Sequence, residues 1–188
     1  MLVLASASPR RQELLRNTGI EFVVHPADVA EVPREREAPR SFAERMAREK
    51  ALAVFVLRPN DLILGADTVV VVEGEILGKP RDAADAVRML RLLSGRKHEV
   101  VTGVCLAGPK LRTENTRSET TLVVMNTLSD DDIRDYVASG EPMDKAGGYA
   151  IQGRASRWIS RIEGDYFNVV GLPVALVWRM LREASGQA

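Results

Sequence analysis

The sequence has few of the residues that build disulfides or zinc sites. It contains one cysteine, Cys105, and two histidines, His25 and His98. One thiol cannot close an internal disulfide, and these ligands are too few for the usual zinc sites. No Ser–His pair suited to nucleophilic catalysis is evident. We therefore expect Cys105 to be a small buried hydrophobe and both histidines to be structural or solvated.

Long apolar runs and an excess of one charge are also missing. No apolar stretch approaches the roughly 20 residues of a membrane-spanning helix, and the short apolar start lacks the charged region of a signal peptide. Lys plus Arg and Asp plus Glu both number 26, whereas a general nucleic-acid binder carries a basic excess. We therefore expect a cytoplasmic protein with no membrane and no nucleic-acid partner. A local basic site for a small anion remains open.

Strand and helix patterns intermix along the chain and predict an α/β or α+β domain with a mixed sheet. The 188 residues, 45% of them apolar, suffice for one domain or for one domain with two lobes. Apolar runs bounded by turn residues predict strands over 2–5, 21–25, 61–66, 68–72, 98–108 and 118–125, with a strand and turn in 159–171. Capping residues and helical periodicity predict helices over 8–17, 41–57, 82–94 and 129–138. A last helix from Pro173 should pack Val174, Val177, Trp178 and Leu181 inward.

The opening stretch LASASPRRQELL places Arg10 and Arg11 on the first turn of a helix. The helix dipole disfavours positive charge there. Ser8 suits the N-cap and Pro9 the first helical position, so free backbone N–H groups lie beside the hydroxyl of Ser6. Such a helix start binds phosphate well, and a bound anion would remove the conflict between dipole and arginines. The alternative is that Ser8 is a plain cap and both arginines are solvated.

The position of Lys50 is unusual for a lysine. It follows Phe42 by eight residues and Met46 by four, so it falls in the middle of the apolar face of the predicted helix 41–57. That face also contains Ala43, Ala47 and Val54. The ammonium must either extend along the apolar surface to water or meet an anion, since an unpaired buried charge costs several kcal/mol.

Two carboxylates are candidates for an acid site. Asp67, in GADTVV, ends an apolar run where one predicted strand gives way to the next, and is either a turn residue or a functional acid. Glu31 lies in the predicted loop 26–40 and is either solvated or a second carboxylate. Carboxylate oxygens suit Mg²⁺ or Mn²⁺, which bind through one or two carboxylates together with substrate phosphates.

Two further segments carry groups that could bind a nucleotide. Lys79 stands between Gly78 and Pro80 and is either a surface lysine or a phosphate ligand. The glycine-rich segment 144–153, with Gln152, is either a flexible loop or a wall that contacts a base. Together these weak signals are the parts of a phosphoryl-transfer site, which stabilises charge on phosphate oxygens. No Walker sequence occurs, which excludes a P-loop enzyme.

Seven motifs appear in an order that resembles one family closely. They are LASASPRRQELL, REKA, LGADTVV, LGKP, LSG with HEVVTGV, DKAGGYAIQG and GDYFNVVGLP. Over nearly the whole chain this resembles the Maf family of nucleoside triphosphate pyrophosphatases. The resemblance implies one Maf domain over 1–188 with an inosine-triphosphatase-like α/β fold: an elongated mixed central sheet flanked by helices, and two lobes with a cleft. It also suggests a homodimer.

The resemblance further implies hydrolysis of a nucleoside triphosphate between its α and β phosphates, with a divalent cation, Mg²⁺ or Mn²⁺, required. The products are the monophosphate and pyrophosphate. The family's general base falls on Asp67 and its acidic loop residue, a candidate metal ligand with Asp67, on Glu31. The family's phosphate-binding positions are Ser6, Arg11, Lys50 and Lys79. Whether Asp67 activates water directly or holds the metal stays open at this point.

Three positions separate the branches of the family. Here they are Arg10, Thr68 and Gln152, a set that resembles the branch acting on dTTP and UTP, with some activity on CTP and modified pyrimidines. The branch acting on 7-methyl-GTP has an aromatic residue in place of Arg10. The expected role is the removal of unwanted nucleotides. Two alternatives remain: a nucleotide-binding regulator of septum formation with incidental hydrolysis, and a related enzyme with purine specificity.

Overall fold

The computed structural model describes residues 1–111 and 114–186. Contacts divide the chain into two compact units. The first unit comprises Met1–Asp67, Thr102–Glu119 and Gly171–Ala188, and the second comprises Thr68–Val101 and Thr120–Val170. Three long strands contribute a segment to each unit: β3 (Leu62–Val72), β5 (Lys97–Ala107) and β6 (Asn115–Met125).

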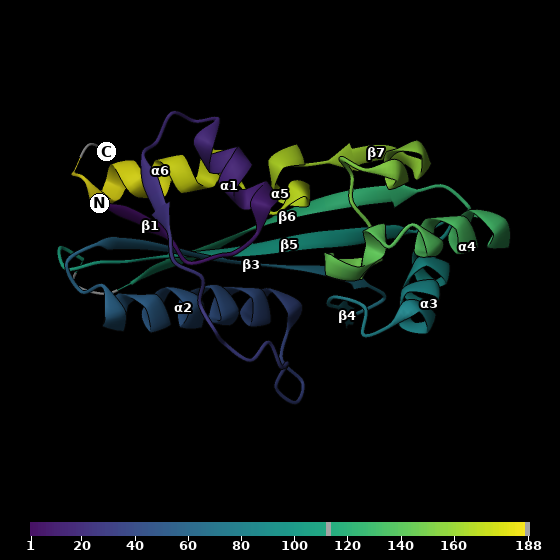
Figure 1. Ribbon diagram of the computed structural model, residues 1–188, viewed down its shortest axis with the longest axis horizontal. Coiled ribbons are helices and arrows are strands. Elements are labelled where there is room, and N and C mark those ends of the chain that lie inside the picture. Colours follow the sequence, from purple (N-terminus) through teal and green to yellow (C-terminus); the bar gives the residue numbers. More distant parts are fainter. Residues whose placement is uncertain (112–113, 187–188) are drawn as a thin grey trace. The chain divides into compact units, whose positions relative to one another are not determined.

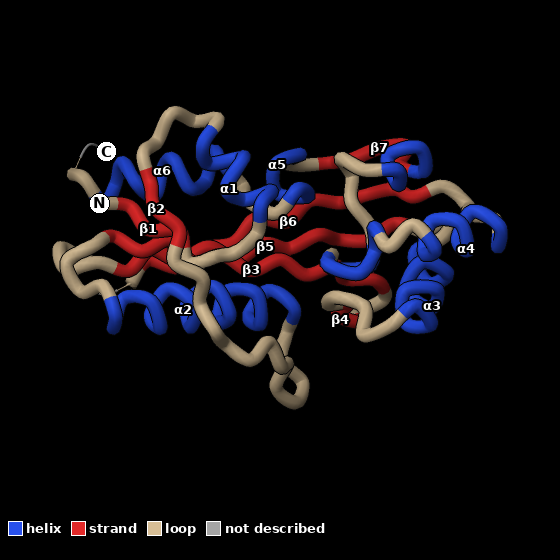
Figure 2. The backbone as a smooth tube through the Cα atoms, in the orientation of Figure 1, coloured by secondary structure: helices blue, strands red, loops and turns tan. Residues whose placement is uncertain are grey.

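The strands form one hydrogen-bonded sheet in the order β2–β1–β3–β5–β6–β7, and β4 pairs with β3. β1 (Leu2–Leu4) pairs in parallel with both β2 (Phe22–Val24) and β3. β4 (Glu75–Leu77) pairs antiparallel with β3, and β7 (Ile159–Glu163) pairs antiparallel with β6. The sheet is therefore mixed, which confirms the expected α/β class (Figure 2).

In the first unit, helices cover both faces of the strands (Figure 1). α2 (Pro39–Leu57) lies on one face, and α1 (Pro9–Arg16) and α6 (Val174–Ala184) lie on the other. Apolar side chains of α2 pack with β1, β3 and β5 in one cluster that includes Cys105, so the expectation of a buried thiol is confirmed. Burial raises the pKa of Cys105 to about 11, as expected of an inert structural thiol.

The close approach of α2 to the strands depends on two glycines. A Cβ at Gly65 would lie 2.1 Å from the carbonyl oxygen of Ala47, and one at Gly103 would lie 2.2 Å from that of Ala43. Both oxygens belong to the α2 backbone, which cannot move aside as a side chain can. These glycines therefore determine how closely α2, and the Lys50 side chain on it, approach the strands.

The second unit is built around a separate apolar cluster. α3 (Ala83–Leu93) and α4 (Asp130–Ala138) pack against each other, and the rings of Tyr136 and Trp158 meet edge to face with centroids 5.3 Å apart. Its remaining helical segments are short: η1 (Glu141–Asp144), η2 (Ala146–Gly148), η3 (Arg154–Trp158) and α5 (Tyr166–Val170).

Three sequence-based expectations are wrong. The predicted strands 61–66 and 68–72 are one continuous strand, so Asp67 lies within β3 and not at a break. α6 buries Leu176, Val177 and Met180, whereas Trp178 is 50% exposed. α5 was taken as a turn, because five residues are too short for helical periodicity to appear.

Among the described residues, no helix has the length and apolarity needed to cross a membrane.

Gly65→Ala should lower the free energy of unfolding by about 2 to 3 kcal/mol, because its Cβ overlaps the α2 backbone. Gly78→Ala is the matched control, since a Cβ there meets nothing within 4 Å. Urea denaturation of both variants checks this. Equal stability of the two variants would contradict the close approach of α2.

We expect His98 to make the stability of the second unit depend on pH. The residue is 2% exposed, Nε2 lies 2.7 Å from the Tyr149 hydroxyl oxygen, and burial lowers its pKa from 6.5 to about 4. The unfolded chain therefore binds this proton first as the pH falls. Stability present above about pH 6.5 should decline by about 3 kcal/mol toward pH 4. His98→Gln should flatten this decline in urea denaturation across that range, and an unchanged slope would refute the assignment.

Candidate functional site

The start of α1 holds Arg11 in a fixed position. Ser8 is the N-cap and its hydroxyl oxygen accepts a bond from the Arg11 backbone N–H at 3.4 Å, as the sequence predicted. The Arg11 guanidinium turns back toward the loop before the helix, where Nη1 donates to Ser6 Oγ at 3.2 Å. Its Nε donates to the backbone carbonyl of Gly171 at 2.8 Å. The side chain is therefore oriented from two sides, and sequence reasoning missed the part played by Gly171.

Lys50 is the centre of the charged cluster. Its Nζ lies 2.5 Å from Oε1 of Glu31 and 2.6 Å from Oδ1 of Asp67. The Lys50 and Asp67 side chains are 9% and 7% exposed, and the Glu31 side chain is 41% exposed. The Lys50 ammonium therefore pairs with anions and does not extend to water. Both anions are carboxylates that were identified as candidates from the sequence on separate grounds.

Burial shifts the pKa of two members of this cluster, Asp67 and Arg11. Burial raises the pKa of Asp67, and the charges of Lys50 and Arg11 oppose that rise. Burial also lowers the pKa of Arg11, opposed by the charges of Asp67 and Glu31. The charges of Arg11 and Asp67 therefore affect each other's pKa, although the two residues lie 56 positions apart in the sequence. The first unit brings together Ser6, Arg11, Lys50, Glu31 and Asp67.

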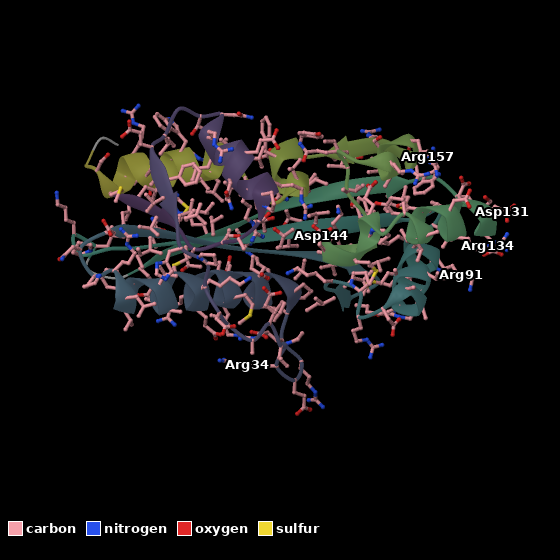
Figure 3. The ribbon with its side chains drawn as sticks, viewed as in Figure 1. Arg34, Arg91, Asp131, Arg134, Asp144 and Arg157 are labelled. Carbon is pink, nitrogen blue, oxygen red and sulfur yellow. The ribbon has the colours of Figure 1, made fainter. Side chains whose placement is uncertain are left out.

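Arg45 holds the loop that carries Glu31. Its guanidinium binds the carboxylate of Glu37 through Nε and Nη2, both at 2.6 Å, and donates to the carbonyl of Val32 at 3.0 Å. These bonds lower the pKa of Glu37 to about 2. By helical spacing Arg45 lies outside the apolar face of α2, yet its side chain is only 15% exposed. Arg34, on the same loop, is labelled in Figure 3.

Of the remaining predicted residues, Arg10 lies on α1 in the first unit, and the other three lie in the second unit. Lys79 is exposed, and the Gly147 N–H donates to the carbonyl of the preceding Gly78 at 3.0 Å. Gln152 is exposed on the turn that follows η2. Thr68 is half-buried and comes directly after Asp67 in β3. Participation of these three residues in the cluster stays a prediction, as does the expected cleft.

Comparison with known sequences assigns the chain to a family. The family described as Maf-like protein matches residues 1–184. The chain belongs to the Maf family. Relatives named dTTP/UTP pyrophosphatase occur in Koribacter versatilis and Symbiobacterium thermophilum. They are 57% and 52% identical to this chain over 97% of its length, and the matches cover 94% and 93% of their own lengths.

Two more proteins are similar to this Maf chain. The dTTP/UTP pyrophosphatase of Geobacter sulfurreducens is 52% identical over 96% of this chain and 95% of its own. A HAM1 protein structure from Coxiella burnetii covers 97% of this chain and 98% of its own, at 17% identity and a TM-score of 0.49. The fold described above does not depend on this second likeness.

Asp67 and Glu31 are the carboxylates of this Maf chain that could hold a divalent cation. Asp67 and Glu31 point at one place, and a positive charge, the Lys50 ammonium, lies between their oxygens. Within residues 1–111 and 114–186, no group of three or more His, Cys, Asp or Glu side chains could hold a metal. A pair of carboxylates nevertheless suits Mg²⁺, which keeps other positions for water and phosphate oxygens.

Lys50→Met should lower the free energy of unfolding by about 3 kcal/mol in metal-free buffer, because Asp67 then keeps a buried charge without its nearest cation. Asp67 has a folded-state pKa raised above 3.8, so protonation favours the folded state. The deficit should therefore shrink as the pH falls toward about 4.

The double variant Lys50→Met with Asp67→Asn tests the cause of that deficit. It should recover most of the lost stability at neutral pH, because no buried carboxylate remains beside the methionine. Urea denaturation of the wild type, both single variants and the double variant measures the coupling. Additive losses would show that Lys50 and Asp67 are independent.

Proposed function

We propose that this chain hydrolyses dTTP and UTP to the monophosphates and pyrophosphate. The observation that carries the proposal is the buried ammonium of Lys50 between Asp67 and Glu31, in a chain of the Maf family. The relatives named dTTP/UTP pyrophosphatase, at 50% identity and above, support the substrate class. The expected role is to remove unwanted or modified pyrimidine nucleotides.

Binding of the triphosphate rests on the cations at the start of α1 and on α2. Arg11 offers a planar set of donors to phosphate oxygens, and Ser6 adds a hydroxyl next to it. A triphosphate would compete with two carboxylates for the Lys50 ammonium, which leaves Asp67 less neutralised. Lys79 is assigned to phosphate binding by the family resemblance.

The reaction breaks the bond between the α-phosphorus and the bridging oxygen toward the β-phosphorus. A water oxygen forms the new bond to phosphorus, and pyrophosphate leaves with the bridging oxygen. Asp67 accepts the proton of the attacking water, and its raised pKa makes it a stronger base than an exposed carboxylate. Arg11 and Lys50 stabilise the negative charge that gathers on the phosphate oxygens.

A divalent cation, Mg²⁺ or Mn²⁺, would be held by Glu31 and Asp67 together with phosphate oxygens. When bound, it supplies positive charge to the phosphates and lowers the pKa of water. Asp67 would then serve both as a ligand and as a base, and in this structure its Oδ1 accepts a bond from Lys50 Nζ.

Selection of the base is assigned to Arg10, Thr68 and Gln152 by the resemblance. The Gln152 amide has a donor and an acceptor, which suits the matching edge of uracil or thymine. The family resemblance also favours a homodimer, and the composition favours a cytoplasmic location.

Asp67→Asn should lower kcat for dTTP by about a hundredfold to ten-thousandfold, because the amide cannot accept the proton. The measurement is pyrophosphate release with Mg²⁺ and with Mn²⁺, using dTTP, UTP, CTP, GTP and 7-methyl-GTP. Wild-type activity should be highest on dTTP and UTP. Release of orthophosphate in place of pyrophosphate would mean that a different bond is cleaved.

Asp61→Asn is the matched control, because Asp61 precedes the same strand and its carboxylate binds Arg58 and the terminal amine. Its kcat should match that of the wild type. Titration calorimetry with dTTP should show that Asp67→Asn still binds nucleotide. If that variant also keeps a septum phenotype in cells, the regulator alternative gains over the enzyme.

A further inference from the structure

The five-residue turn that carries Gln152 is fixed at both ends by one pair of side chains. The backbone N–H of Ala150 donates to the Tyr136 hydroxyl oxygen at 3.3 Å. The backbone N–H of Arg154 donates to both carboxylate oxygens of Glu141, at 3.1 and 3.3 Å. The Tyr136 hydroxyl donates in turn to Glu141 Oε1 at 2.9 Å. The exposed Gln152 thus lies between two anchored residues.

The anchoring pair is itself held firmly. Tyr136 is fully buried, and its ring packs edge to face on Trp158. The backbone carbonyl of Glu141 accepts a bond of 2.6 Å from the Lys145 ammonium, so the start of η1 is fixed as well. Asp144, labelled in Figure 3, marks the end of this short segment. Both anchors therefore have packing or hydrogen-bond partners of their own within the second unit.

Gly153 leaves room for the Glu141 carboxylate, because it has no Cβ. A Cβ at Gly153 would lie 1.9 Å from Glu141 Oε1 and 2.7 Å from its Cδ. Gly153 has φ −100° and ψ −157°, a conformation open to alanine. The glycine is therefore required by the contact with Glu141 and not by the backbone.

We propose that Tyr136 and Glu141 are positioning residues for base selection, because they fix the turn on which Gln152 meets the pyrimidine. This inference rests on the function proposed above, in which Gln152 reads the base. A glutamine side chain discriminates between bases only when its amide is held at a set place, since ordering a mobile turn opposes binding. Tyr136 and Glu141 supply that order before the nucleotide arrives.

The test compares variants of the anchors with Gln152→Ala in the full chain. Glu141→Ala should raise KM for dTTP about fivefold to tenfold, the effect of losing about 1 kcal/mol of ordering, with kcat within about twofold. The preference for dTTP over CTP should fall by a similar factor. Tyr136→Phe should act in the same direction and keep the ring contact with Trp158.

Two substitutions separate positioning from a general loss of structure. Glu141→Gln keeps an oxygen that can accept from Tyr136 and Arg154, so it should restore at least half of the base preference. Gly153→Ala should reproduce the loss, because its Cβ displaces the carboxylate. Asp135→Asn, an exposed carboxylate of α4, is the control and should match the wild type.

A ligand without a base completes the design. Inorganic tripolyphosphate, used as a competitive inhibitor, should keep its inhibition constant in Glu141→Ala and Tyr136→Phe, because it has no base to position. Equal weakening of tripolyphosphate and dTTP would overturn the inference in favour of a structural role. A normal dTTP-to-CTP preference in both anchor variants would also overturn it.

The outcomes also separate this inference from the proposed function. If Gln152→Ala alters the base preference and the anchor variants do not, the positioning role is refuted and the proposed function stands. If Gln152→Ala itself has no effect on the preference, the assigned role of Gln152 is wrong. If the wild type releases no pyrophosphate from dTTP or UTP, the proposed function fails.

Discussion

The ammonium of Lys50 is the charge around which the first unit is organised. A buried lysine is tolerated only with anionic partners, because desolvation of an unpaired ammonium costs several kcal/mol. Here the partners are Asp67 from β3 and Glu31 from the loop before α2. One interaction therefore ties together a strand, a helix and a loop. The same three groups suit the proposed reaction: the ammonium suits a phosphate, the two carboxylates suit a metal, and Asp67 suits the proton of a water.

The backbone around this cluster is shaped to hold it. Gly65 and Gly103 let α2 lie close to the strands, and Arg45 fixes the loop that delivers Glu31. Arg11 is turned toward the cluster by bonds to Ser6 and Gly171. The charged groups are therefore pre-oriented, which is the condition for electrostatic stabilisation of a developing charge.

A similar arrangement recurs in the second unit at the turn of Gln152. There the exposed residue has little structure of its own, and the order comes from Tyr136 and Glu141 behind it. In both units, residues assigned to the substrate are held by residues that play no direct part in the chemistry. Neither Arg45 nor Glu141 was identified from the sequence, because their roles depend on contacts with loop segments that follow no periodic pattern.

Several features could be predicted from the sequence because they depend on local chemistry. Ser8 was correctly predicted as a cap, since a cap requires only a side-chain oxygen and nearby backbone N–H groups. The apolar face of α2, with Lys50 inside it, followed from helical spacing. Asp67 was misplaced at a strand end, because a carboxylate inside a buried strand contradicts propensity unless a cation neutralises it.

The sequence alone determined the mixed α/β class, the approximate starts of α1, α2, α3, α4 and α6, the family and the candidate residues, because local spacing and motif order encode these. The tertiary structure decided which candidates meet. Glu31, Lys50 and Asp67 come from three different elements, and only the packing of α2 on β3 brings their charges within hydrogen-bonding distance. The partners of Arg11 and the anchors of Gln152 were decided in the same way, since contacts between distant segments leave no periodic signal in the sequence.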